Sequence, residues 1–293
     1  MSEPGHLGEL THSNQGTIIV KMNRIPDKFW HRTLKQPYHL KRTVDTGQGA
    51  PVVLLHGIGR SGRVWQRVVE GFAGQPYRLV AFDLLGFGES PKPHWPSYNV
   101  DDHAAAVINS IEKLGLNQPV VLVGHSMGSL VSVRVARTRP DLVKHLVLYE
   151  MPLYDGLPEK KRYQLRLDLY RKFYEKIISY NPTFDDKKTM RLIERFGRKG
   201  IGVEVTPETW QPFIKRLDNT IIKQAIAQDI QAIDVPMDVI YGTFDMFVIR
   251  GDLQQTFGTD SDHITAHNIR ATHVISVKAS RFLVERIQAA VLG

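Results

Sequence analysis

The sequence predicts an α/β protein with a mostly parallel, doubly wound sheet and an inserted block of helices. Short runs rich in valine and leucine, typical of strands buried on both faces, alternate with stretches of helical length. Such alternation implies parallel strand pairing, with helices on both faces of the sheet. The alternation stops between residues 151 and 233, where no buried strand is predicted. This stretch is therefore expected to form a separate helical layer.

Length and composition are those of an ordinary globular protein. The 293 residues suffice for one large α/β domain with an insertion, and 42% of them are hydrophobic. The chain has no cysteine, which excludes disulfides and thiolate metal sites. It shows neither a signal-peptide pattern nor an apolar run of membrane-spanning length. We therefore predict a cytoplasmic protein without a transmembrane segment.

The formal net charge of +8 is unevenly distributed. Residues 151–216 hold 15 lysines and arginines against 9 aspartates and glutamates. A basic segment can attract an acidic substrate, an anionic membrane surface or nucleic acid. Here the positive charges are interleaved with acids and no nucleic-acid motif accompanies them. We interpret the segment as a solvated helix surface and predict no nucleic-acid partner.

The first third of the chain contains two loops with candidate functional residues. Strands are predicted at residues 17–22, 40–44, 51–55 and 78–83. The third strand leads into His56-Gly57-Ile58-Gly59, a loop that can turn the Ile58 N–H toward a reacting oxygen. This loop does not match the glycine patterns that bind phosphate. His56 is interpreted as a residue that ties the loop together, and Asp83 as one that braces the following loop through backbone N–H groups.

The central stretch is Gly124-His125-Ser126-Met127-Gly128. It lies between a valine-rich predicted strand at residues 119–123 and a predicted helix at residues 129–137, which is the context of a nucleophile elbow. Such a turn would hold the Ser126 Oγ exposed at the end of the sheet. The N–H of Met127 would lie at the helix start, where the helix dipole favours a developing negative charge.

The helical block begins with a strongly amphipathic stretch at residues 158–180. A second helix is predicted at residues 185–198. A third begins with Thr206 as N-cap and Pro207 at the first helical position. We predict that residues 152–232 form a helical cap inserted into a core made of residues 1–151 and 233–293.

The sheet is expected to resume at residues 236–242 and to end with a less hydrophobic strand at residues 262–269, nearer the sheet edge. Asp245 follows the first of these strands and His273 the second. A serine hydroxyl needs a base to accept its proton and an acid to orient that base. Ser126, Asp245 and His273 each follow a different predicted strand, in the chain order that a Ser–Asp–His set requires on such a sheet.

Glu150 is the alternative acid, because it ends the predicted strand that follows the elbow helix. Asp245 is preferred because it follows the next core strand and precedes His273 by 28 residues. A closing helix is predicted at residues 279–291.

From about residue 40 to residue 290 the sequence resembles the α/β-hydrolase superfamily. Five segments, each at a predicted strand end, carry the resemblance: Leu55-His56-Gly57-Ile58-Gly59, Asp83-Leu84-Leu85-Gly86-Phe87-Gly88-Glu89-Ser90, Gly124-His125-Ser126-Met127-Gly128, Tyr241-Gly242-Thr243-Phe244-Asp245 and His273. The resemblance implies that Ser126 is the nucleophile, His273 the base and Asp245 the orienting acid. It also implies an oxyanion hole formed by the N–H groups of Ile58 and Met127, with no cofactor and no metal.

The residue at position 126 narrows the choice among subfamilies. Epoxide hydrolases and haloalkane dehalogenases of this fold use aspartate there, which leaves esterases, lipases, thioesterases, carbon–carbon bond hydrolases and perhydrolases. The carbon–carbon hydrolases resemble His-Gly-x-Gly-Pro-Gly in the first loop, where this chain has Arg60-Ser61-Gly62. We predict hydrolysis of a small-molecule carboxylic ester or thioester through an acyl-enzyme. A cofactor-free perhydrolase, a carbon–carbon bond hydrolase and a ligand-sensing relative with little turnover remain alternatives, and the oligomeric state is left open.

Overall fold

The computed structural model describes residues 7–12, 18–23, 29–34, 36–154, 161–180, 187–188, 191, 204–248 and 262–293. The chain divides into two compact units, residues 1–38 and residues 39–293. In the smaller unit, β1 (Leu7–His12) pairs antiparallel with β2 (Ile18–Asn23), and a short π-helical segment, η1 (Phe29–Thr33), follows. The sequence predicted β2 but not β1. Residues 7–12 show no apolar pattern that predicts a strand, and nothing in their composition indicates that they pair with β2.

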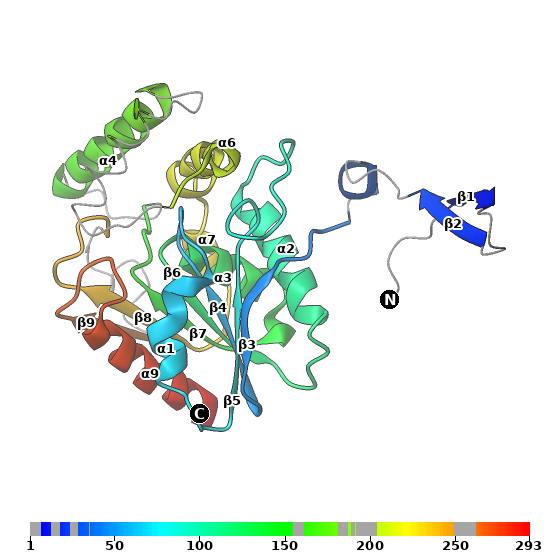
Figure 1. The fold of residues 1–293 in the computed structure, drawn as a ribbon. Coiled ribbons are helices and arrows are strands. Elements are labelled where there is room, and N and C mark those ends of the chain that lie inside the picture. Colours follow the sequence, from blue (N-terminus) through cyan, green and yellow to red (C-terminus); the bar gives the residue numbers. More distant parts are fainter. Residues whose placement is uncertain are drawn as a thin grey trace. The chain divides into compact units, whose positions relative to one another are not determined.

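The larger unit is built on a seven-stranded sheet with the order β3-β5-β4-β6-β7-β8-β9 (Figure 1). The β3–β5 pair is antiparallel and every other pair is parallel. This confirms the predicted mostly parallel α/β class. The order reverses between β4 and β6, and ligands bind outside the carboxyl ends of the strands at such a point. The strands are β3 (Arg42–Thr46), β4 (Ala50–Leu55), β5 (Tyr77–Phe82), β6 (Val120–His125), β7 (Val143–Tyr149), β8 (Met237–Gly242) and β9 (Ile264–Ile269).

Strand composition follows position in the sheet. All residues of β6 and β8 are buried, as expected for central strands covered on both faces. β9 is the last strand of the sheet and is half-buried to exposed along its length, which agrees with its predicted place near the edge.

Helices cover both faces of the sheet (Figure 1). One layer contains α1 (Gln66–Glu70) and α9 (Val277–Leu292), with η2 (Gly62–Trp65) leading into α1. The other contains α2 (Val100–Glu112) and α3 (Met127–Thr138), which pack against each other. Asn99 caps α2 by accepting a hydrogen bond from the Asp102 N–H, and Ser276 caps α9 by accepting one from the Ala279 N–H. The turn η3 (Pro140–Leu142) connects α3 to β7.

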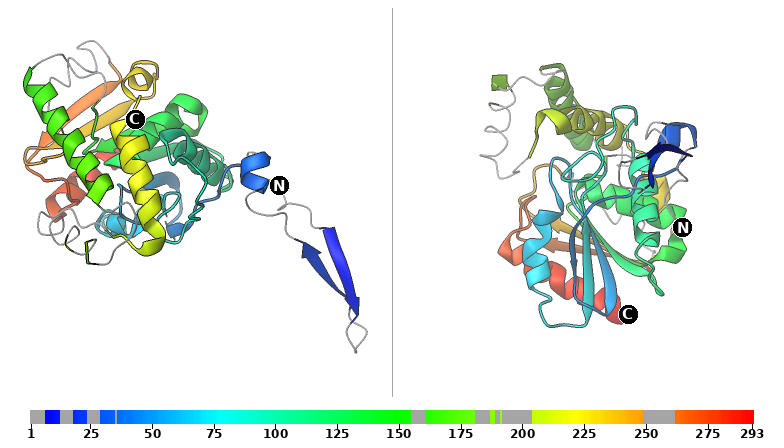
Figure 2. Two further views of the ribbon diagram at one scale, coloured as in Figure 1. Left: turned by 90° about the horizontal axis from the view of Figure 1, so that it is seen from above. Right: turned by 45° about the vertical axis from the view of Figure 1, so that its right-hand side comes forward.

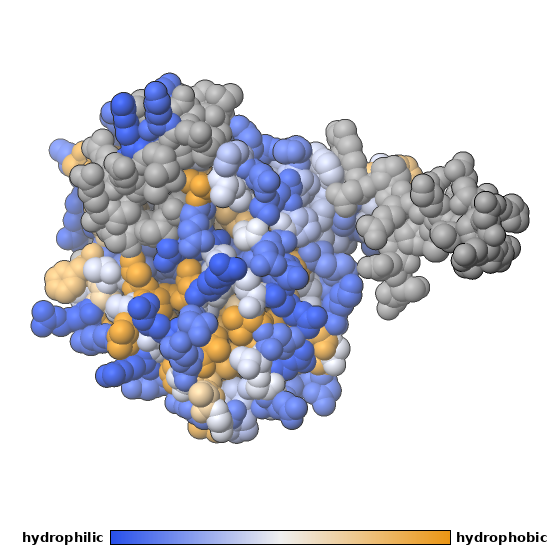
Figure 3. Space-filling view, in the orientation of Figure 1, coloured by the Kyte–Doolittle hydropathy of each residue, from blue (hydrophilic) through white to orange (hydrophobic). Residues whose placement is uncertain are grey.

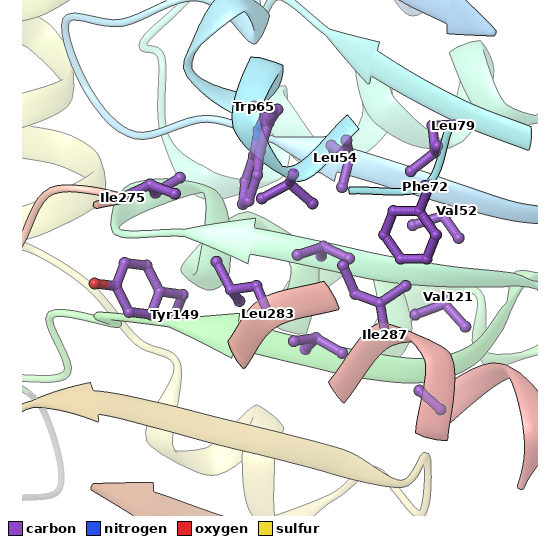
Figure 4. Close-up of a cluster of buried hydrophobic side chains, with 14 of the residues drawn as sticks. Val52, Leu54, Trp65, Phe72, Leu79, Val121, Tyr149, Ile275, Leu283 and Ile287 are labelled. Atoms are coloured by element: carbon purple, nitrogen blue, oxygen red, sulfur yellow. The ribbon is translucent and has the colours of Figure 1, made fainter. Parts of the chain in front are cut away.

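The layer of α1 and α9 encloses a cluster of buried hydrophobic side chains against the sheet (Figure 4). Leu283 and Ile287 of α9 are fully buried against Val121 of β6 and its neighbours. Trp65, also fully buried, joins the same cluster from the start of α1. Burial of these side chains holds the helices against the sheet and fixes the loops at the carboxyl ends of the strands.

Between β7 and β8 the chain is helical in its described part, as the sequence predicted. The elements are α4 (Lys161–Tyr180), α6 (Pro207–Arg216), η4 (Leu217–Ile222) and α7 (Ala227–Gln231). Thr206 is the N-cap of α6 and exchanges hydrogen bonds with Thr209, which agrees with the predicted helix start. The helix predicted at residues 185–198 lies largely outside the described residues. Figures 1 and 2 show α4 and α6 on the same side of the unit.

Two sets of contacts attach this block to loops that follow strands. At the end of α6, the fully buried Arg216 donates from Nε to His103 Nε2 at 2.8 Å, and its guanidinium carbon lies 3.8 Å from the Phe87 ring centroid. Burial lowers the pKa of Arg216 well below its ordinary value. Tyr154 donates to the Phe247 carbonyl at 2.9 Å, and Tyr170 of α4 donates to the Met246 carbonyl. The block therefore lies over the loops after β5 and β8.

Within the described part of the chain, no helix is both long and apolar enough to cross a lipid bilayer.

Candidate active site

Ser126 occupies a strained turn between β6 and α3. Its backbone angles are φ 54° and ψ −122°, in the region that L-residues rarely adopt. Two hydrogen bonds hold this conformation: the Ser126 N–H donates to the Tyr149 carbonyl and the Ser129 N–H donates to the Ser126 carbonyl, each at 2.9 Å. The strain turns the side chain of Ser126 away from the strand and toward the loops at the carboxyl edge.

The glycines on either side of the turn are required by close backbone approach. A Cβ at Gly124 would lie 2.5 Å from the Ser129 Cα, and a Cβ at Gly128 would lie 2.4 Å from the Leu55 carbonyl oxygen. Any side chain at these positions would push α3 away from β6 or from β4. The Gly-x-Ser-x-Gly spacing therefore follows from the close packing of strand, turn and helix at this junction.

The structure brings Ser126, His273 and Asp245 together in one hydrogen-bonded chain. His273 Nε2 lies 2.9 Å from Ser126 Oγ, and His273 Nδ1 lies 2.6 Å from Asp245 Oδ2. A carboxylate only accepts, so Nδ1–H donates to Asp245 and leaves Nε2 as the acceptor for the Ser126 hydroxyl. Ser126 is 4% exposed and Asp245 is 3% exposed. The arrangement suits transfer of a proton from Ser126 to His273.

Asp245 is held as a carboxylate. Burial opposes its ionisation, but the hydrogen bond and charge of His273, together with the Phe247 N–H, lower the pKa of Asp245 to about 2. The Phe247 N–H donates to Asp245 Oδ1 at 2.6 Å, which leaves Oδ2 for His273. Each carboxylate oxygen thus has its own donor, and this fixes the plane of the carboxylate.

Glu150, the alternative acid, lies beside Asp245. It follows β7, is fully buried and has a φ of 52°, with its N–H donating to the Ile240 carbonyl at 2.9 Å. A Cβ built on Gly242 would lie 2.3 Å from Glu150 Oε1, so the Glu150 side chain lies directly against β8. Glu150 lies close enough to influence the pKa of Asp245, but it is Asp245 that bonds to His273. The structure therefore places the two candidate acids in one buried pair.

The loop after β4 is fixed beside the serine. The His56 ring donates from Nδ1 to the Gly57 carbonyl at 2.7 Å and accepts from the Leu84 N–H at Nε2 at 2.8 Å. A Cβ at Gly57 would lie only 3.0 Å from the Ser126 Cβ. Ile58 is the predicted oxyanion-hole residue of this loop. It directly follows Gly57, whose backbone lies against Ser126.

Met127, the other predicted donor, directly follows Ser126 and begins α3. The first N–H groups of a helix have no acceptor within the helix, so the Met127 N–H is available to an external oxygen.

Asp83 braces the neighbouring loop as predicted. Its Oδ1 accepts from the Gly62 N–H at 2.7 Å and its Oδ2 accepts from the Glu89 N–H at 2.8 Å.

Two further residues position His273 and were not singled out from the sequence. His125 Nε2 donates to the His273 carbonyl at 2.8 Å, and the Tyr149 hydroxyl donates to the Thr272 carbonyl at 2.9 Å. His125 occupies a variable position inside the Gly-x-Ser-x-Gly motif, and Tyr149 follows a run of three apolar residues at the end of β7. Nothing in either pattern indicates a bond to a loop more than 120 residues away. No group of three or more histidine and acidic side chains in the described residues is arranged to hold a metal ion.

The buried histidines predict a stability that falls in acid. Burial lowers the pKa of His56 to about 4 and that of His125 to about 3. An unfolded histidine takes up its proton near pH ~6.5, so between that pH and 4 the unfolded state binds more protons than the native state. The free energy of unfolding is expected to fall as the pH drops through this window, by about 1.4 kcal/mol per pH unit for each of the two residues.

Urea unfolding at a series of pH values measures this slope. His125→Gln, which cannot titrate, should make the slope shallower, whereas His94→Gln at an exposed position should leave it unchanged. Equal slopes for the wild type and His125→Gln would contradict the assignment.

The chain belongs to the α/β-hydrolase fold family, whose model matches residues 50–256 and so includes Ser126 and Asp245. A probable lysophospholipase of Arabidopsis thaliana, BODYGUARD 4, is 36% identical over 109 residues, which are 37% of this chain and 26% of the relative. The 2-hydroxymuconate semialdehyde hydrolase of Pseudomonas sp. strain CF600 is 28% identical over 181 residues, which are 58% of this chain and 56% of the relative. The matches span about a quarter to about half of the length of these curated relatives.

Among solved structures, an esterase from Exiguobacterium antarcticum superimposes with a TM-score of 0.68 at 16% identity. The superposition covers 88% of this chain and 100% of the esterase. At this identity the likeness establishes the shared fold.

Proposed function

We propose that this protein is a serine hydrolase that cleaves a carboxylic ester or thioester of a small molecule through an acyl-enzyme. The observation that carries the proposal is the hydrogen-bonded chain from Ser126 Oγ to His273 and on to Asp245, at 2.9 and 2.6 Å. A nucleophile, a base and an orienting acid in this order, at a strained turn after a parallel strand, are the parts that acyl transfer requires.

The first half of the reaction forms the acyl-enzyme. Ser126 Oγ attacks the carbonyl carbon of the substrate while its proton moves to His273 Nε2. The carbonyl oxygen becomes an oxyanion that accepts hydrogen bonds from the N–H groups of Ile58 and Met127. The tetrahedral intermediate collapses by breaking the bond to the alcohol or thiol, which leaves with the proton from His273.

The second half restores the enzyme. Water attacks the acyl carbon and gives its proton to His273, and the new intermediate releases the acid as Ser126 Oγ regains its proton. Asp245 remains a carboxylate throughout. It keeps the hydrogen of the neutral imidazole on Nδ1 and stabilises the imidazolium that forms in each half.

We further propose that residues 152–232 act as a cap that selects substrates. Tyr154 and Tyr170 bond to carbonyls that directly follow Asp245, so α4 and the start of this segment adjoin the loop that carries Asp245. Residues 1–151 and 233–293 would then supply the catalytic core.

Carbon–carbon bond hydrolysis is the second candidate, favoured by the sequence similarity to the 2-hydroxymuconate semialdehyde hydrolase. A panel of p-nitrophenyl esters of increasing acyl length, matched acyl thioesters and a vinylogous 1,5-diketone distinguishes the two. We expect steady release of p-nitrophenol or free thiol. A folded protein that cleaves only the diketone would favour the second candidate, and one that turns over no substrate of the panel would contradict both.

A further inference from the structure

Helix α4 carries leucines on its solvent side. Leu165 is 61% exposed and Leu169 is 64% exposed, although each is large and aliphatic. The opposite side of the same helix is buried through Tyr163, Leu167 and Tyr174. Packing against the protein therefore explains the buried apolar side of α4. It does not explain Leu165 and Leu169, which lie four residues apart on one exposed face of the helix.

One face of α4 carries basic side chains and no acidic ones. At 3.6 residues per turn, the outer face of α4 comprises Arg162, Leu165, Leu169, Lys172, Phe173 and Lys176. Its three charged residues are all basic and exposed. The acids of the helix, Asp168 and Glu175, lie about a quarter turn or more away from the centre of this face. Arg171 lies on the same side of the helix as these acids, so the helix as a whole is not divided by charge, but the charged residues of its outer face are all basic.

Exposed apolar side chains also occur on a loop next to α4. Phe244 and Met246, on either side of Asp245, are 58% and 48% exposed. Tyr170 of α4 donates to the Met246 carbonyl, so α4 lies next to this loop. Figure 3 shows strongly hydrophilic side chains projecting from the region of α4 at the upper left of the molecule.

We propose that the outer face of α4 docks on a lipid bilayer that contains anionic lipids. The leucines and Phe173 would enter the boundary between headgroups and acyl chains, while Lys172 and Lys176 would meet lipid phosphates. A helix lying in the membrane plane with aliphatic side chains between basic ones is suited to this position. The proposal concerns binding alone and does not depend on the chemistry of Ser126.

Charge and polarity favour this occupant over two others. A second copy of the chain would bring like charges together, because the outer face of α4 contains bases and no acid. Nucleic acid would pair with the bases but would give Leu165 and Leu169 no apolar surroundings. An anionic bilayer offers an apolar environment to the leucines and negative charge to the basic side chains.

Co-sedimentation of the full chain with vesicles tests the proposal. We expect binding to vesicles of phosphatidylcholine with phosphatidylglycerol, weaker binding to phosphatidylcholine alone, and release at high salt. Lys172→Glu with Lys176→Glu, and separately Leu165→Ser with Leu169→Ser, should each lower the partition coefficient at least about fivefold. Thermal melting checks that both double variants stay folded.

Matched controls lie on α9. Leu292→Ser, at an 82% exposed leucine, and Lys278→Glu, at an exposed lysine, should leave binding unchanged. The proposal is overturned if the wild type does not bind anionic vesicles, or if the α9 variants weaken binding as much as the α4 variants do. It is also overturned if the wild type is a dimer that the leucine substitutions convert to a monomer without any effect on vesicle binding.

Discussion

Ser126→Ala is expected to lower kcat/KM for ester hydrolysis by about 10³-fold or more. Alanine removes the only atom that can form the acyl bond and leaves His273 without a hydroxyl to deprotonate. Nucleophile and base act as one unit, so the loss is far larger than that of a single hydrogen bond. Initial rates with the best p-nitrophenyl ester of the panel measure the effect.

The fold of this variant is expected to stay intact. The strained backbone at position 126 is held by main-chain hydrogen bonds that alanine retains, namely those of the Ser126 N–H and of its carbonyl. Ser132→Ala is the matched control, because Ser132 is a buried serine of α3, the helix that follows Ser126, and donates to the Gly128 carbonyl. A folded Ser126→Ala protein with wild-type rates, or an equal loss in Ser132→Ala, would refute the role of Ser126.

The sequence was sufficient to predict the sheet and the positions of the candidate residues because both depend on local pattern. Parallel strands end at one edge, so residues that directly follow buried strands meet there whatever the intervening chain does. Ser126, Asp245 and His273 each lie within a few residues of a strand end. Their convergence was therefore predictable without knowledge of any side-chain contact.

Contacts between distant elements were not predictable in this way. The bond from His125 to the His273 carbonyl and the burial of Glu150 against Gly242 arise from the packing of neighbouring strands, and no local pattern encodes them.

Asp245→Asn is expected to lower kcat by about 10⁴-fold while Ser126 and His273 stay in place. The amide of asparagine can donate to His273 Nδ1, which then becomes the acceptor and shifts the ring hydrogen to Nε2. In that tautomer Nε2 faces Ser126 Oγ with a hydrogen and cannot accept the serine proton. The imidazolium that forms in the transition state also loses the carboxylate that stabilises it.

Glu150→Gln is the discriminating partner of this variant. Glutamine preserves the volume against Gly242 and keeps an amide that can donate to Asp245, so we expect kcat to stay within about tenfold of the wild type. The hydrogen bond from Phe247 and the bond to His273 belong to Asp245 alone, and neither is altered. Steady-state kinetics of both variants, with thermal melting of each, measure the contrast. If Glu150→Gln loses activity about 10⁴-fold and Asp245→Asn keeps it, Glu150 is the acid that orients His273.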